Sequence, residues 1–276
     1  MNRTLIVCVI ATATSAWADA VIYSTVPAPL PPNSPSLGYE ATSTQEFGDL
    51  IQFDGTSRNL TDVSVVMSNW AYESEWEKLG TSTGFSLPLT LNLYNVGAGD
   101  TVGSVIATQT ISAFIPWRQE PTPGTCAPGS NNDYLGSDGK CYTGSNSTVT
   151  FDFSGTTVPD SIIYGLAYNT TDHGYNPTGV PGPYESLNFA LSEVPPTVGS
   201  NPLPDTAYWN TSYAGFYTDG GTAGVDIFRQ DTGWAPDSGI IQFDATSTVP
   251  EPKYTALAGG IIFLSLLIRR MKLQGA

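Results

Sequence analysis

LPLTLNLYNV (Leu87–Val96) places a leucine at every second position from 87 to 93, and the turn-forming residues Gly97–Asp100 follow. Alternation with a period of two puts these leucines on one face of an extended strand and the residues between them on the other. Glycine and aspartate then favour a tight turn. The stretch therefore predicts a half-buried antiparallel strand whose leucines need a second layer of side chains to cover them.

Further stretches of similar strand character recur along the chain, separated by connections rich in Gly, Pro and Asn. Long helical periodicity is absent, and the only helix-like stretch, Asn69–Gly80, is read as one or two turns or as an irregular loop. Many short strands with long connections are typical of a two-layer β-structure. We therefore predict an all-β fold, an antiparallel jelly-roll-like β-sandwich, over residues 39–248. The other predicted strands are Asp49–Asp54, Leu60–Ser68, Val105–Phe114, Ser147–Phe153, Asp160–Tyr168, Ser186–Ser192 and Gly239–Ala245.

Two similar octapeptides bracket this region, LIQFDGTS (Leu50–Ser57) and IIQFDATS (Ile240–Ser247). The match is too short to indicate a tandem repeat, so we interpret it as similar strand chemistry near the two ends. In many sandwiches the first and last strands are close together. We therefore expect both ends of the domain on one side of the molecule, which suits a body held from its C-terminus.

The N-terminal residues have the pattern of a secretory signal peptide. Arg3 precedes the apolar run Leu5–Ala13, and Ala16 and Ala18 supply the two small residues that signal peptidase recognises. We predict a signal peptide at residues 1–18, cleavage before Asp19 and therefore an exported protein; a short buried N-terminal helix is the alternative. Residues 19–38 are proline-rich and predict an extended spacer outside the core.

Cys126 and Cys141 are the two cysteines of the predicted exported part, in a loop rich in Gly, Asn, Ser and Asp. In an oxidising compartment a short-range pair of this kind most simply forms a disulfide. Closing such a loop would stabilise the fold by about 3 kcal/mol in the chain-entropy model. Free thiols or a metal site are the alternatives, although a metal would need ligands beyond two thiols.

The chain is strongly acidic, with 25 Asp and Glu against 10 Lys and Arg. Such a charge balance repels nucleic acid and anionic lipid headgroups, so we predict no nucleic-acid partner. The Asp- and Asn-rich loops leave a structural calcium ion open as an alternative to a plain solvated surface. We expect no other metal or cofactor.

The sequence offers little catalytic chemistry. His173 is the only histidine, it lies in a loop, and no Glu or His stands near it at metal-ligand spacing. The nucleophile-elbow, zinc-protease and phosphate-loop motifs are absent. Glu73, Glu75 and Glu77 are candidates for paired carboxylates, so a glycoside hydrolase stays the weaker alternative. We predict a protein that is not an enzyme.

An aromatic segment suggests a second kind of site. Tyr208, Trp209, Tyr213, Tyr217 and Trp234 lie among short polar residues between Asp205 and Gly239. Aromatic faces stack on the CH groups of pyranose rings, and short polar side chains bind hydroxyl groups, so these five residues are candidates for a sugar-binding platform. The alternative is that the same aromatics fill the core of the sandwich.

The C-terminal end carries three features in order. Val249-Pro250-Glu251-Pro252 comes first, the uncharged run Tyr254–Ile268 follows, and the cations Arg269, Arg270 and Lys272 close it. Together with an N-terminal signal peptide, this order resembles the PEP-CTERM sorting signal of Gram-negative bacterial envelope proteins. The strand pattern of residues 55–170 is similar to the mostly uncharacterised β-sandwich ectodomains that precede this signal.

The resemblance implies a location more than an activity. It implies that exosortase, a membrane transpeptidase, recognises residues 249–252, after signal peptidase has acted at the other end. The run Tyr254–Ile268 is shorter than the about 20 residues that span a bilayer core, but Lys253 and Arg269 can snorkel, so the segment can span with the basic residues as a cytoplasmic stop. Because the prolines of the motif make an extended stretch suited to an enzyme's cleft, we expect this inner-membrane helix to be transient. The protein would then reach the cell surface or extracellular matrix. We expect a structural or adhesive role there, with a lectin-like module that binds extracellular polysaccharide as the alternative.

Overall fold

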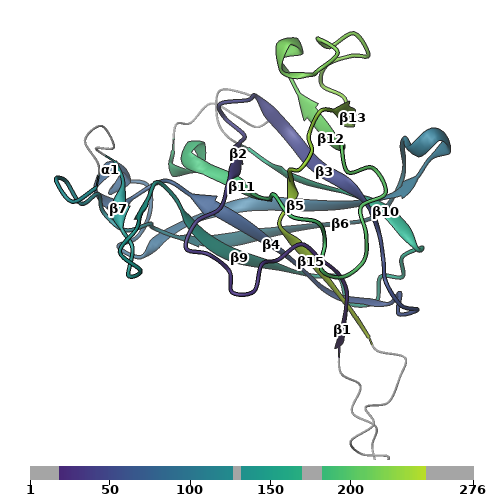
Figure 1. Cartoon of the computed structure of the whole chain (residues 1–276), viewed down its shortest axis with the longest axis horizontal. Helices are drawn as coiled ribbons and strands as arrows, with labels where there is room; N and C mark the ends of the chain where they lie inside the picture. The colour runs from purple at the N-terminus through teal and green to yellow at the C-terminus, as the bar shows by residue number, and fades with distance from the viewer. Residues whose placement is uncertain (1–18, 127–131, 170–181, 247–276) are drawn as a thin grey trace, which may run out of the picture.

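The computed structural model describes residues 19–126, 132–169 and 182–246, and this part of the chain is an all-β sandwich of antiparallel sheets (Figure 1). One sheet has seven strands in the order β1-β15-β4-β11-β14, with β2 also pairing with β11 and β9 with β4. The other has six, in the order β13-β12-β3-β10-β5-β6. A small third sheet pairs β7 with β8.

The seven-stranded sheet contains β1 (Asp19–Ser24), β2 (Ser36–Gly38), β4 (Leu60–Asn69), β9 (Ser145–Asp152), β11 (Leu187–Ser192), β14 (Ser238–Gly239) and β15 (Ile241–Thr246). The six-stranded sheet contains β3 (Thr44–Gln52), β5 (Gly84–Val96), β6 (Val102–Pro116), β10 (Ser161–Tyr168), β12 (Thr206–Thr211) and β13 (Arg229–Thr232). The remaining elements are β7 (Tyr134–Leu135), β8 (Cys141–Tyr142), α1 (Glu73–Trp76) and the 3-10 turns Ala98–Asp100, Pro183–Ser186 and Ala214–Phe216.

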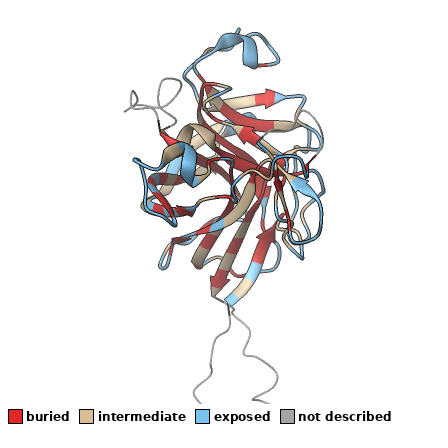
Figure 2. Ribbon diagram, turned by 90° about the vertical axis from the view of Figure 1, so that its left-hand side faces the viewer, coloured by how far each residue is buried: buried red, intermediate tan, exposed pale blue. Residues whose placement is uncertain are grey.

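The core lies between the two large sheets, where the buried residues of both sheets gather (Figure 2). Leu89, Leu91 and Leu93 of β5 are each 0% exposed, which confirms the leucine alternation. Phe189 of β11 and Phe243 of β15 belong to the same cluster from the other sheet. Burying one such side chain is worth about 1.5–3 kcal/mol, so this interface is the main stabilising feature of the fold.

The predicted all-β class is confirmed. Each of the eight stretches predicted as strands overlaps a strand of the structure. Asn69–Gly80 forms a single helical turn, α1, within an otherwise irregular connection.

The predicted spacer at residues 19–38 is wrong, because its two ends are strands of the seven-stranded sheet. β1 pairs with β15, and β2 pairs with β11. Ile22 and Tyr23 are 2% and 1% exposed, so this segment also supplies core side chains. The prolines that suggested a spacer all lie between the two strands, where their missing amide hydrogens cost no ladder hydrogen bond.

Both ends of the described domain lie side by side. Asp19 at the start of β1 pairs with Thr246 at the end of β15. Figure 1 shows strands β1 and β15 reaching the bottom of the described part together. The expectation that the two ends are close is confirmed, although β15 pairs with β1 and β4 and not with the strand near Leu50. The connection between β12 and β13 projects at the opposite end (Figures 1 and 2).

Candidate functional site

The predicted disulfide is present. Cys126 and Cys141 are bonded, with their Cα atoms 5.7 Å apart. In the same connection, Arg118 is 4% exposed and stacks over the ring of Tyr72 at 4.6 Å and over that of Tyr134 at 5.8 Å. Its Nε also donates to the backbone oxygen of Trp70 at 2.7 Å. The disulfide and this buried cation therefore hold the long connection between β6 and β9 against the body.

Most of the predicted sugar-binding aromatics belong to the interior. Tyr208, Trp209 and Tyr217 are 0%, 4% and 3% exposed, and half-buried Trp234 packs edge-on against Trp209 at 5.0 Å between ring centroids. Trp209 also donates its indole N–H to Thr44 at 2.8 Å. The predicted platform of five residues is therefore wrong, because buried rings cannot stack on a sugar.

The physical reason is that residues 206–211 form strand β12. Its period of two turns Trp209 toward the core between the sheets and Tyr208 to the other face. There Tyr208 packs with Leu50 and Ile163, and Phe228 lies against it at 6.1 Å. Both rings are thus covered, on opposite faces of one strand.

Tyr213 alone of the five is exposed, and it lies in the connection Ser212–Phe228, which we call the tip loop. Its side chain is 60% exposed, that of Ile227 50% and that of Phe216 36%. The rings of Tyr213 and Phe216 meet edge-on at 5.1 Å. The tip loop is therefore an apolar spot at the end of the molecule opposite the paired ends of the domain (Figures 1 and 2).

Polar contacts hold the tip loop in shape. The Arg229 guanidinium lies 3.8 Å above the Tyr217 ring and donates to Asp219 at 2.8 Å. The Tyr217 hydroxyl contacts the backbone of Trp209, Thr211 and Ile227 within 3.2 Å. The exposed rings thus stand on an ordered base.

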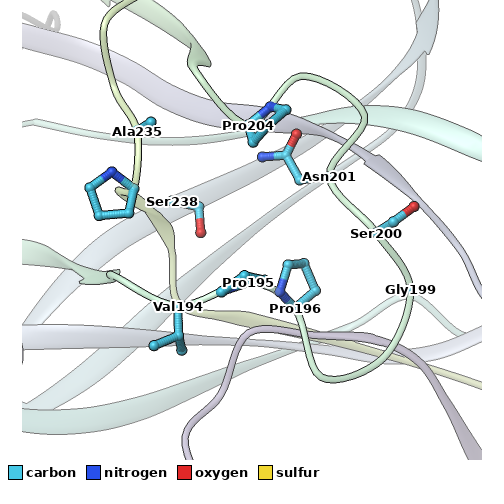
Figure 3. A pocket seen from close by; sticks show the side chains of 10 residues that line it. Val194, Pro195, Pro196, Gly199, Ser200, Asn201, Pro204, Ala235 and Ser238 are labelled. Carbon is cyan, nitrogen blue, oxygen red and sulfur yellow. The ribbon is translucent and has the colours of Figure 1, made fainter.

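A pocket of about 450 Å³ opens between the segments 194–204 and 235–238, which face each other in Figure 3. Its wall contains four prolines, Pro195, Pro196, Pro204 and Pro236, and no charged side chain. Asn201 is its link to the interior, because its amide donates to the buried carboxylate of Asp49 at 2.7 Å. The pocket suits a small uncharged group with an apolar face.

Polar side chains lie in a row across the outer face of the six-stranded sheet. We call Glu46, Thr90, Asn92, Thr108 and Thr110 the polar strip. Asn92 donates to Glu46 at 2.9 Å and accepts from Thr108 at 2.9 Å, while the hydroxyls of Thr90 and Thr110 meet at 2.8 Å. Thr108 and Thr110 are exposed, Thr90 and Asn92 are half-buried, and Glu46 is 8% exposed. The strip thus joins a buried carboxylate to open hydroxyl groups.

A hollow of about 260 Å³ adjoins the polar strip, lined by Thr90, Pro88, Ala167 and Tyr184. Ala167 pairs in register with both Thr90 and Glu46, so the hollow lies over the same row of the sheet. Phe114, 52% exposed, stands four residues beyond Thr110 on the same face of β6. The outer face therefore offers hydroxyl, amide, carboxylate and aromatic groups together.

Glu46 and Asp49 are the two buried carboxyl groups of β3. Burial raises the pKa of both, against the hydrogen bonds that Asn92 and Tyr94 give to Glu46 and that Leu50 N–H and Asn201 give to Asp49. Three positions apart on one strand, they face opposite sides of the sheet. They therefore do not form a facing acid pair, and Glu73, Glu75 and Glu77 are all exposed in and after α1.

The remaining predicted positions are not placed by the structure. Ala16, Ala18, His173, the motif Val249–Pro252 and the basic residues Arg269, Arg270 and Lys272 lie outside the described residues, and Asp19 is the first residue of β1. Within the described ranges, no helix is long and apolar enough to cross a membrane. In that same part of the chain, no three His, Cys, Asp or Glu side chains gather as metal ligands.

Comparisons of the chain with protein-family models, with curated proteins and with solved structures find no match.

Proposed function

We propose that this chain is an exported, non-catalytic protein of the bacterial cell surface or extracellular matrix, with a structural or adhesive role. The observation that carries the proposal is the pairing of Asp19 with Thr246. The sequence Val249–Pro252 begins three residues after β15 ends. A body with both ends at one side can be held there by a sorting signal while its other end, with the tip loop, faces outward.

The jelly-roll-like topology, the signal peptide at 1–18 and the transient C-terminal helix belong to the same proposal. Signal peptidase and exosortase are the partners that export would require. No cofactor is invoked, and structural calcium stays an open alternative. A glycoside hydrolase is not part of this proposal, because Glu46 and Asp49 lie on opposite faces of β3.

Sorting can be tested in a host that carries an exosortase. Changing Pro250 and Pro252 together to Ala should leave the protein in the inner membrane, because the recognition element is lost. The matched control is Pro202→Ala, an exposed proline of the ectodomain that lies far from the motif in sequence. Intact-mass measurement of the mature wild-type protein should show that the segment with Arg269 and Arg270 is gone. A surface product that retains both arginines would contradict the proposal.

Carbohydrate binding is the second candidate function, and we propose it for the polar strip. Neither β5 nor β6 contains a charged residue, and the chain as a whole is acidic, which favours an uncharged glycan over an acidic one. Hydroxyl and amide groups match sugar hydroxyls in donor and acceptor capacity. Phe114 supplies an exposed ring for the CH face of a pyranose.

Affinity electrophoresis in gels that contain dextran, galactomannan or alginate tests this placement. Thr90→Val with Thr110→Val, or Phe114→Ala, should reduce retardation by a neutral polysaccharide at least tenfold. The matched control is Ser64→Ala with Thr150→Val, which removes the equivalent hydroxyl pair, 2.9 Å apart, from β4 and β9 of the other sheet. No retardation of the wild type by either neutral polymer would reject a glycan site for these sugars. If Tyr213→Ala abolishes the retardation instead, the glycan site lies in the tip loop.

A further inference from the structure

Strand β6 ends the six-stranded sheet. Among the described residues its ladder of backbone hydrogen bonds runs to β5 alone, over Gly84–Val96. At 15 residues it is also the longest strand of the structure's described part. An edge strand presents a row of unpaired N–H and C=O groups, which is a template for another strand.

The sequence of β6, VGSVIATQTISAFIP, does little to protect this edge. It contains no charged residue, and its only proline, Pro116, is its last residue. Natural edge strands are usually blunted by lysine, by proline or by bulges. The irregular pairings of β6 all lie between Val102 and Ala107, so the stretch Ala107–Pro116 pairs regularly with β5 and is left without a blunting device.

The same stretch is nearly self-complementary about Ile111. An antiparallel copy centred there places Thr110 opposite the partner's Ser112 and Gln109 opposite the partner's Ala113. Thr108 then faces Phe114 on the outer side of the sheet. Each residue of one copy lies opposite a residue of the other copy whose side chain points to the same side of the sheet, as in any antiparallel pair. Hydroxyl lies against hydroxyl, and Ile111 lies against its own copy.

The low charge of β6 also selects the partner. The chain has a formal net charge of −15, so two copies repel each other over most of their surface. Strands β5 and β6 carry no charge at all. They are therefore a surface on which two acidic copies can approach without opposing like charges.

We propose that two copies of this protein associate by antiparallel pairing of their β6 edges, centred on Ile111, so that two six-stranded sheets become one continuous sheet. This inference rests on the proposed structural role and specifies how copies join. The contact is isologous: the same patch is used by both copies, so it closes a dimer and leaves both tip loops outside the contact.

Disulfide trapping of the full chain, exported into an oxidising compartment, tests the register. Ile111→Cys should form a reducible dimer on a gel in most of the protein, because the two Cα atoms would lie about 5 Å apart. Gln109→Cys is the matched variant. Its two copies would be four residues apart along the strands, about 13 Å, which is beyond the reach of a disulfide.

A second measurement needs no cysteine. Analytical ultracentrifugation of the mature protein should show a dimer for the wild type and a monomer for Thr110→Lys with Ser112→Lys, at unchanged thermal stability. Ser212→Lys with Thr222→Lys, two exposed positions of the tip loop beyond the opposite edge of the same sheet, should remain dimeric. A monomeric wild type, or cross-linking at Gln109→Cys without cross-linking at Ile111→Cys, overturns the proposal. Localisation measured on the same cells keeps this result separate from the sorting test, since a protein can reach the surface as a monomer.

Discussion

At the scale of single residues, Glu46 is unusual because it is a buried carboxyl group on the outer face of a sheet. Its carboxylate is 8% exposed and receives two neutral donors, Asn92 and Tyr94, but within the described ranges it makes no ion pair. A buried charge without a cation costs free energy. A residue that lowers stability and lies within a row of exposed hydroxyls is typical of a binding site, where stability is traded for function.

The pH dependence of stability follows from the direction of its pKa shift. Burial raises the pKa of Glu46 in the folded state above its unfolded value. This group therefore favours folding fully below the unfolded pKa, and the contribution is lost as the pH rises through the folded pKa. Glu46→Gln keeps an acceptor for Asn92 and Tyr94 and removes the charge.

We therefore expect Glu46→Gln to be more stable than the wild type at pH 7, by about 1 kcal/mol. The difference should vanish below about pH 3, where the wild-type carboxyl is neutral in both states. Urea unfolding at the two pH values measures this. A variant that is less stable at pH 7 would mean that the carboxylate is compensated in the folded protein.

At the scale of elements, strands with a clear period of two could be predicted and short strands could not. β5 was evident because Leu87, Leu89, Leu91 and Leu93 alternate without a break. β2, β13 and β14 have three, four and two residues, too few for a period to emerge. β12 carried the signal of a strand, since Ala207 and Trp209 alternate with polar neighbours, but its rings also suggested a surface.

The N-terminal segment was missed because its prolines dominate its composition. Ile22 and Tyr23 beside them are core residues, and Tyr23 meets Phe243 edge-on at 6.2 Å. Pairing of β1 with β15 joins residues more than 200 positions apart in the chain. No local pattern can reveal such a contact, because it depends on the arrangement of the whole sheet.

The burial of Tyr23 in β1 can be tested by substitution. Tyr23→Ala should lower the free energy of unfolding by about 3–5 kcal/mol, because a buried aromatic is replaced by a cavity. Pro32→Ala, at an exposed proline of the same segment, should change it by less than about 1 kcal/mol. Chemical denaturation of both variants measures the difference. Equal, small effects would mean that residues 19–38 behave as a spacer in solution.

At the scale of the whole molecule, the class of the fold and the closeness of its ends could be predicted from the sequence. The binding surfaces could not, because they depend on which faces of the sheets are covered. Tyr208 and Asn92 both point to the outer face of the six-stranded sheet. Phe228 packs over Tyr208 and covers it, whereas Asn92 is only half-buried within the polar strip. Coverage of this kind comes from distant loops and has no sequence period.

The proposed glycan site and the proposed dimer contact lie on the same six-stranded sheet. Pairing through β6 would set the polar strips of two copies next to each other, since Thr108 and Thr110 lie on that strand. A long neutral polysaccharide could then contact both strips at once, and the second contact would be intramolecular. Loss of the dimer through Ser112→Lys alone, a residue of β6 outside the polar strip, should therefore also weaken retention by the polymer while leaving short oligosaccharides unaffected.

The pairing of β15 between β1 and β4 also has a mechanical consequence. β15 ends at Thr246, at the side of the molecule where the proposed sorting signal would hold it. Its hydrogen bonds to both neighbours are perpendicular to the strand. A pull on the C-terminal end thus loads these bonds together, in shear, instead of opening them one at a time. Resistance of this kind is governed by the unfolding rate under load, and it suits a body that must withstand drag while one end is fixed.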